Sequence, residues 1–188
     1  MYMKLINKIY NKALIKYYNV SVGKNFVCEG RLIIQGHGKY SIGNNVHIIS
    51  EESINPIGGN RTVLQTLDGA SITIGNNCGL SHAVLAARKE IVIEDDVMIG
   101  AGVRIFDNDF HSIDYASRME NPDTNIRSSP VRIRQGAFIG AHSILLKGVE
   151  IGHHAVIGAG SVVTKSVPGR EIWAGNPATF VREIKEGE

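Results

Sequence analysis

The segment that decides the fold is residues 133–167, IRQGAFIGAHSILLKGVEIGHHAVIGAGSVVTKSV, in which a large aliphatic residue returns at every sixth position. These aliphatic residues are Ile133, Ile139, Leu145, Ile151, Ile157 and Val163. Four positions after each of them stands a small or β-branched residue: Ala137, Ser143, Val149, Ala155, Ser161 and Val167. Two series that keep step over six consecutive units indicate a structural repeat.

A period of six matches neither the 3.6 residues of an α-helix turn nor the two-residue alternation of a flat strand. It is typical of a solenoid in which each hexapeptide forms one side of a triangular prism and three hexapeptides complete a coil. The large aliphatic side chains then point into the prism, and the smaller ones lie near its corners. Glycine, of which the chain has 21, suits corners where φ is positive or two backbones approach closely.

The solenoid is predicted to cover residues 20–170 within a single domain, because 188 residues leave little chain for a second one. The same period occurs upstream at Ile93, Ile99 and Ile105, with weaker traces nearer the N-terminus. Residues 106–130 interrupt the repeat and contain one histidine and five acidic residues. A long loop within a compact domain is usually functional, so we predict an active-site loop here; a solvated excursion is the alternative.

Both ends of the solenoid are expected to be closed by helices, since open ends would expose core and strand edges. Residues 1–19 predict an amphipathic helix with apolar residues on one side and a lysine stripe at i, i+4 spacing. The apolar residues are Leu5, Ile6 and Ile9, and the lysines are Lys4, Lys8, Lys12 and Lys16. The stripe is either a solvated face or a weak contact with an anionic membrane surface. In the tail of residues 171–188, residues 179–185 are predicted to form a short helix after Pro177.

Composition argues against several classes of partner. A net charge of +2 and an aromatic content of 6% do not indicate nucleic-acid binding. Cys28 and Cys78 are too few for a disulfide framework and are expected to be buried free thiols in a reducing compartment. No apolar run is long enough to span a membrane, and residues 1–19 do not read as a secretory signal. A cytoplasmic location is therefore predicted.

Four segments carry a resemblance to a known family: IGNNCGLS (residues 74–81), FDNDFHSID (106–114) followed by Arg118, SVVTK (161–165), and AGNPA (174–178) followed by Val181 and Arg182. Together they resemble the hexapeptide-repeat acyltransferases. The likeness is closest to the sugar O-acetyltransferases of the galactoside and maltose acetyltransferase type and of surface-polysaccharide biosynthesis. It covers residues 60–184, about two thirds of the chain.

The resemblance implies an all-β, left-handed parallel β-helix that assembles into a homotrimer, with each active site between two neighbouring prisms. It also implies acetyl-CoA as co-substrate along the C-terminal coils and no metal. The positions that match CoA contacts of the family are Ala141, Ala159, Thr164, Lys165 and Arg182. Lys165 and Arg182 would pair with CoA phosphates. Ser81 stands where galactoside-type enzymes have an acceptor-binding asparagine, and Thr179 stands at a basic position of the family.

Acetyl transfer from a thioester to a hydroxyl requires a base, donors for the oxyanion, and alignment of the two substrates. Histidine suits the role of base because its ordinary pKa is near neutral. Of seven histidines, only His111 lies in the long loop, flanked by carboxylates. We predict that His111 is the general base and that Asp109 or Asp114 holds its other ring nitrogen. No motif indicates an acyl-enzyme, so direct transfer in a ternary complex is expected.

Other polar residues of the loop have two interpretations each. Asp107 and Asn108 are candidates for hydrogen bonds to acceptor hydroxyls. Arg118 either anchors the loop or meets an anionic sugar. With Ser81, these residues make up the predicted acceptor site.

Three other functions compete with sugar O-acetylation. An enzyme of the same fold could acetylate the amine of a nucleotide-linked amino sugar, and the sequence separates the two poorly. A zinc hydratase of the carbonic anhydrase type needs three histidine ligands, but the loop offers His111 alone and His82 has no matching partner. A non-catalytic scaffold is disfavoured by the presence of both the loop histidine and the C-terminal CoA motif.

Overall fold

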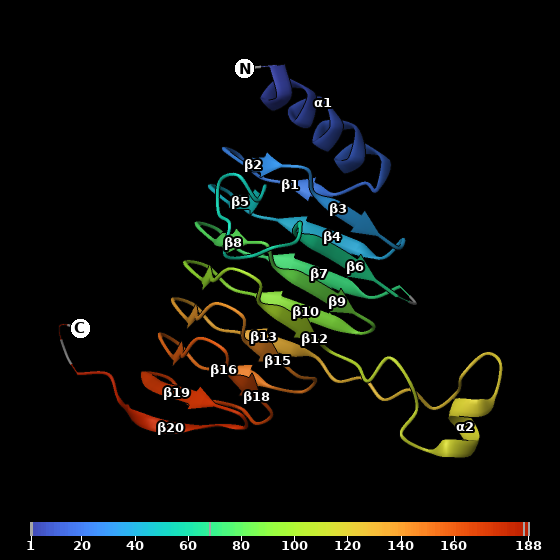
Figure 1. Ribbon diagram of the computed structural model, residues 1–188, viewed down its shortest axis with the longest axis vertical. Helices are drawn as coiled ribbons and strands as arrows, with labels where there is room; N and C mark the ends of the chain where they lie inside the picture. Colours follow the sequence, from blue (N-terminus) through green and yellow to red (C-terminus); the bar gives the residue numbers. More distant parts are fainter. Residues whose placement is uncertain (1, 68, 186, 188) are drawn as a thin grey trace.

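Three parallel β-sheets, visited in rotation by the chain, make up most of the molecule (Figure 1). The structure is a computed structural model that describes residues 2–67, 69–185 and 187. Sheet A consists of β1 (Ser21–Val22), β4 (Lys39–Ile42), β7 (Ser71–Ile74), β10 (Glu90–Ile93), β13 (Val131–Ile133) and β16 (Glu150–Ile151).

Sheet B consists of β2 (Val27–Gly30), β5 (His47–Ser50), β8 (Gly79–Ser81), β11 (Met98–Ile99), β14 (Phe138–Ile139), β17 (Val156–Ile157), β19 (Glu171–Gly175) and β20 (Ala178–Glu183). Sheet C consists of β3 (Ile33–Gln35), β6 (Val63–Thr66), β9 (Val84–Ala87), β12 (Arg104–Phe106), β15 (Ile144–Leu145) and β18 (Val162–Val163). From β1 to β18, every third strand therefore joins the same sheet, as a coil of three hexapeptides requires, whereas β19 and β20 both extend sheet B.

The core is a stack of aliphatic side chains in register from coil to coil. In sheet B, Ile99 pairs with Ile139, which pairs with Ile157, and all three are at most 3% exposed. The same order holds for Ile93, Ile133 and Ile151 in sheet A and for Ile105, Leu145 and Val163 in sheet C. The inward positions predicted from the six-residue period are thus confirmed. Each such side chain contributes about 1.5–3 kcal/mol by leaving water.

The corners of the coils use residues that tolerate positive φ or lack a side chain. At one corner, Asn45, Asn77 and Asp96 have φ between 55° and 61°, and their side chains are linked by hydrogen bonds of 2.9 Å. At another, a Cβ on Gly140 would stand 2.5 Å from the backbone nitrogen of Ala159 in the next coil. Only glycine permits that spacing, which explains why it follows the inward aliphatic residue.

The helix α1 (Tyr2–Tyr17) lies across the end of the solenoid above β2 (Figure 1). Its buried residues are Asn7 and Asn11, whereas Leu5, Ile6 and Ile9 are exposed. The predicted apolar side therefore does not face the solenoid, and the apolar contact of α1 with the core is made by Leu14 and Ile15 instead. Within the described residues, neither helix has the length and apolar character needed to cross a membrane.

The C-terminal segment differs from the prediction. Residues 179–185 were expected to begin a short helix after Pro177, but Ala178–Glu183 is β20, which pairs antiparallel with β19. Thr179, Phe180 and Val181 are β-branched or aromatic and favour a strand. Pro177 lies in the turn between the two strands, where its missing N–H costs no ladder bond.

Candidate active site

The loop between β12 and β13 begins and ends at a narrow base, here called its neck, where Asp107 and Ser129 face each other. This neck is held by the buried carboxylate of Asp107. This carboxylate accepts hydrogen bonds of 2.7 Å from the backbone N–H groups of Arg88, Lys89 and Glu90. The side chain is fully buried, and its backbone carbonyl accepts from Ser129 N–H across the neck. The two ends of the loop are thus tied to each other and to the preceding coil.

Asn108 completes the neck. Its Nδ2 donates to the carboxylate of Asp107 at 3.1 Å, and its Oδ1 accepts from the N–H of Phe110 at 2.8 Å. Both side chains are buried, and their polar atoms bond to the loop itself and to the preceding coil. Asp107 and Asn108, predicted to bind acceptor hydroxyls, thus bond to groups of the protein itself in this structure and position the loop.

His111 lies beyond the neck with its side chain 72% exposed. Its Nδ1 is 3.0 Å from Oδ2 of Asp123, and the same oxygen accepts from the N–H of Ser112 at 3.1 Å. With a proton on Nδ1, the hydrogen bond to the carboxylate leaves Nε2 as an unprotonated base facing outward. This is the pairing that general-base chemistry requires.

Asp109 and Asp114, the predicted partners of His111, have other roles. Asp109 forms an ion pair with Lys147, whose Nζ is 2.5 Å from its Oδ1. Asp114 caps the short helix α2 (Tyr115–Met119) by accepting from Ser117 N–H at 2.8 Å. Hydrogen bonds from Ser117 hold the pKa of Asp114 below its ordinary value. The carboxylate beside His111 is instead Asp123, whose twelve-residue separation gave no sequence signal.

Arg118 anchors the histidine segment from the other side. Its guanidinium donates to the carbonyl oxygens of Ser112 and Ile113 at 2.7 and 3.1 Å. Of the two predicted roles of Arg118, the structure supports that of a loop anchor. Arg118 and Asp123 thus hold residues 111–113 between them.

Ser81, the predicted acceptor contact, lies where β8 ends. Its hydroxyl accepts from Nδ2 of Asn55 at 2.9 Å, and Asn55 belongs to the insertion between β5 and β6. The next residue, His82, is 1% exposed, and its Nδ1 contacts the carbonyl oxygen of Asn60 in the same insertion. The insertion thus covers this corner of the solenoid.

The predicted CoA positions lie on two different parts of the chain. Ala141 and Ala159 occupy the same corner in successive coils, and the carbonyl of Ala141 accepts from the N–H of Gly160. Thr164 and Lys165 are exposed just after β18 of sheet C. Arg182 lies on β20 of sheet B, so the structure does not place it beside Lys165.

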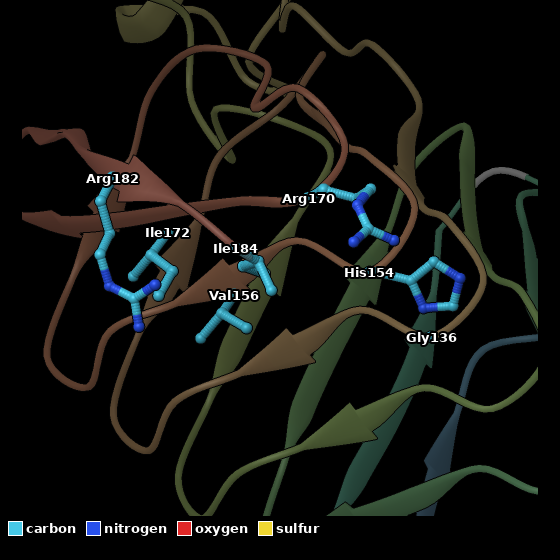
Figure 2. Close-up of a pocket in the computed structure, with 7 residues that line it drawn as sticks. All are labelled: Gly136, His154, Val156, Arg170, Ile172, Arg182 and Ile184. Atoms are coloured by element: carbon cyan, nitrogen blue, oxygen red, sulfur yellow. The ribbon is translucent and has the colours of Figure 1, made fainter. Parts of the chain in front are cut away.

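Arg182 instead lines a hollow of about 490 Å³ on sheet B (Figure 2). Arg170 and His154 stand at the other side of this hollow, and aliphatic side chains form its floor. Its lining residues are Gly136, His154, Val156, Arg170, Ile172, Arg182 and Ile184. Arg170 and His154 had no role in the sequence-based prediction; their positive φ values, 59° and 56°, place them at corners of the coils.

The two cysteines are unsuited to nucleophilic chemistry. Burial raises the pKa of Cys28 to about 12 and that of Cys78 to about 11, so both thiols stay protonated near neutral pH. Both are free thiols, and Cys78 is buried at an inward position. Among the described residues, His, Cys, Asp and Glu side chains form no group of three or more that could hold a metal ion.

Comparison with known proteins identifies the repeat. Residues 130–165 match the family described as bacterial transferase hexapeptide (six repeats). Over 119 residues, 63% of this chain, the sequence is 32% identical to Escherichia coli galactoside O-acetyltransferase and 35% identical to Saccharomyces cerevisiae YJL218W. The matched region spans 57% and 59% of those proteins, somewhat more than half of their length.

Solved structures extend the likeness to nearly the whole chain. AntD, an N-acyltransferase from Bacillus cereus in complex with dTDP-4-amino-4,6-dideoxyglucose and coenzyme A, has a TM-score of 0.75 and 25% identity. The match covers 94% of this chain and 90% of AntD. The Vibrio cholerae acetyltransferase VCA0836 with acetyl-CoA shares the fold at a TM-score of 0.61, 23% identity, and coverage of 98% and 84%. The chain thus carries a hexapeptide-repeat transferase domain, and the proteins that resemble it in sequence and in fold are acyltransferases.

Proposed function

We propose that the protein transfers acetyl from acetyl-CoA to a hydroxyl of a sugar or a surface-polysaccharide precursor. The observation that carries this proposal is the hydrogen bond between His111 and Asp123. The loop that holds this pair is anchored by Asp107 at its neck and by Arg118 beside the histidine. The sequence likeness to galactoside O-acetyltransferase favours a hydroxyl as the acceptor. We further propose that the solenoid formed by the three sheets is a left-handed β-helix, as the resemblance to the family implies.

In the proposed reaction, the carboxylate of Asp123 holds the proton of His111 Nδ1, and Nε2 accepts the proton of the acceptor hydroxyl. The hydroxyl oxygen forms a bond to the thioester carbonyl carbon, and the tetrahedral oxyanion collapses as the carbon–sulfur bond breaks. The departing thiolate takes the proton from the imidazolium, which yields the ester and free CoA. Asp123 stabilises the imidazolium throughout, and no acyl-enzyme forms.

A homotrimer is part of the proposal because His111 is too exposed for a complete site in one chain. A closed ring needs two different complementary patches on each protomer. The outward residues of sheet B include Met98 and Phe138, which are 55% and 47% exposed, and those of sheet C include Val84 and Ile144. Sheet A instead carries outward ion pairs such as Arg132 with Glu90. Sheets B and C are therefore the proposed contact surfaces.

CoA is proposed to lie along the corner of Ala141 and Ala159, with its phosphates near Thr164 and Lys165. Arg182 would then reach the same CoA from the neighbouring protomer, because within one chain it belongs to sheet B. A cytoplasmic location is proposed with it, since free thiols suit a reducing compartment.

Amide formation is the second candidate, and the likeness to AntD over most of the chain favours it. The same His111 could take a proton from an ammonium group before attack. The test is transfer of labelled acetyl from acetyl-CoA to sugars, amino sugars and nucleotide sugars, comparing wild type with His111→Ala. Alkali-labile label that nearly vanishes in the variant supports O-acetylation; alkali-stable label supports amide formation. Equal transfer by both proteins would remove His111 from the mechanism.

A further inference from the structure

The first two-thirds of the helix α1 contact the solenoid through buried asparagines, and Leu14 and Ile15 pack against the core near its C-terminal end. Asn7 and Asn11 are 8% and 4% exposed. Asn11 donates to the carbonyl of Gly30 at 2.8 Å and accepts from the N–H of Leu32 at 3.0 Å, and Asn7 accepts from Arg31 at 3.0 Å. The amide of Asn11 thus satisfies two backbone groups of the first coil, which has no preceding coil to pair with, and Asn7 bonds the side chain of Arg31.

Several apolar residues in the first half of α1 lie on the side of the helix away from these asparagines. Ile9 lies two positions from both asparagines, so at about 100° per residue it occupies the opposite side of the helix. It is 62% exposed. The other exposed apolar residues of the helix are Met3 at 66%, Leu5 at 59%, Ile6 at 39%, Tyr10 at 37% and Tyr17 at 74%. Leu5, Ile6 and Ile9 fall within one arc of about 100° around the helix, and an exposed apolar patch of this kind marks an interaction surface.

The charge of the helix indicates what this surface meets. Residues 2–17 contain four lysines and no acidic residue, and the first carboxylate side chain of the sequence is Glu29. The lysines follow each other at i, i+4 and run along one flank of the apolar side. Lys12 and Lys16 are both exposed there. Lysine stems can lie along an apolar surface while their ammonium groups reach an anionic boundary.

We propose that the outer side of α1 binds the surface of an anionic lipid membrane, with its apolar residues in the headgroup region and its lysines against lipid phosphates. The helix lies across one end of the solenoid (Figure 1), so the membrane would contact that end and leave the three sheets free. In the proposed trimer, rotation about an axis parallel to the solenoid brings three copies of α1 to the same end. Three weak contacts then act together.

The experiment is sedimentation of the full chain with vesicles of phosphatidylglycerol and phosphatidylcholine, compared with vesicles of phosphatidylcholine alone. Binding is expected to the anionic vesicles and to weaken with salt. The double variant Ile6→Gln/Ile9→Gln should bind about thirtyfold more weakly, because it removes the apolar contact. Lys12→Gln/Lys16→Gln should lose about thirtyfold on anionic vesicles only.

The matched control is Ile57→Gln, since Ile57 is 63% exposed on the insertion after β5 and should not alter binding. Equal binding to both vesicle types, unchanged binding of the isoleucine variant, or an equal loss in the control would overturn the proposal. Association of the chain beyond a trimer that the isoleucine variant abolishes would assign the surface to a second copy instead. Vesicle binding requires no catalysis, so a failed acetyl-transfer assay leaves this test unaffected, and the isoleucine variant should retain transfer to a soluble acceptor.

Discussion

Replacing Asp123 by asparagine tests the role of the carboxylate beside His111. Asparagine can still accept the hydrogen bonds from His111 Nδ1 and Ser112 N–H, but it carries no charge. The change therefore removes the electrostatic stabilisation of the imidazolium and preserves the shape of the loop.

The size of the effect follows from exposure. Two unit charges about 4 Å apart interact by about 1 kcal/mol in water and about 4 kcal/mol near a protein surface. The imidazole is 72% exposed and the Asp123 side chain 14% exposed, so we expect a value between these limits, about 2 kcal/mol. That corresponds to a loss of about thirtyfold in kcat. His111→Ala, which removes the base itself, should cost about 10²–10⁴-fold.

The assay is steady-state acetyl transfer at saturating acetyl-CoA, with Asp114→Asn as the control. Asp114 is a carboxylate of the same loop that caps α2, and asparagine caps a helix equally well, so this variant should retain its rate. Full activity of Asp123→Asn, or an equal loss in Asp114→Asn, would refute the assignment of Asp123.

Two further predictions concern stability. Burial raises the pKa of Glu94, but hydrogen bonds from Arg134 and from the backbone outweigh it and hold the pKa below its ordinary value. The ionised carboxylate therefore contributes to the free energy of unfolding above the pKa of the unfolded state. This contribution is lost as pH falls through the pKa of the folded state. Glu94→Gln should cost less than about 1 kcal/mol in urea unfolding at neutral pH and nothing in strong acid; an unchanged difference in acid would contradict this. Gly140→Ala should lower the free energy of unfolding by about 3 kcal/mol, because its Cβ would clash with the backbone at Ala159. Gly160→Ala should lower it by about 1 kcal/mol, because the new side chain has open space but φ is +71°. Equal melting temperatures of these two variants would argue against close coil packing at Gly140.

The architecture could be predicted because its signal is local and repeated. Ile133, Ile139 and Leu145 follow one another at the six-residue spacing that the prism requires. This one period predicts where the strands lie, which sheet each strand joins, and which residues are in register. His111 could be predicted because it lies in the loop that interrupts this period, and that loop is rich in carboxylates. Its partner Asp123 could not be predicted in the same way. The chain brings Asp123 next to His111 by reversing direction through α2, and no rule of sequence spacing predicts such a contact.

Two features were mispredicted or missed for physical reasons. Pro177 suggested a helix start, but the preference of residues 178–183 for extended backbone and the free edge of β19 outweighed it. In α1, hydrophobic periodicity gave the helix but not its orientation. The first coil offers unpaired backbone groups at Gly30 and Leu32, so the amide of Asn11 is buried where an apolar residue would ordinarily pack.

The asparagine contacts of α1 also bear on end-to-end association of the solenoid. A parallel sheet that ends in unpaired backbone groups is a template on which the last strand of another molecule can add, and repetition of that contact produces a filament. With Asn11 bonded to both Gly30 and Leu32, an incoming strand would first have to displace the helix. Truncation of α1 should therefore convert a soluble particle into one that grows end to end, with fibre formation visible by light scattering before any loss of β-structure.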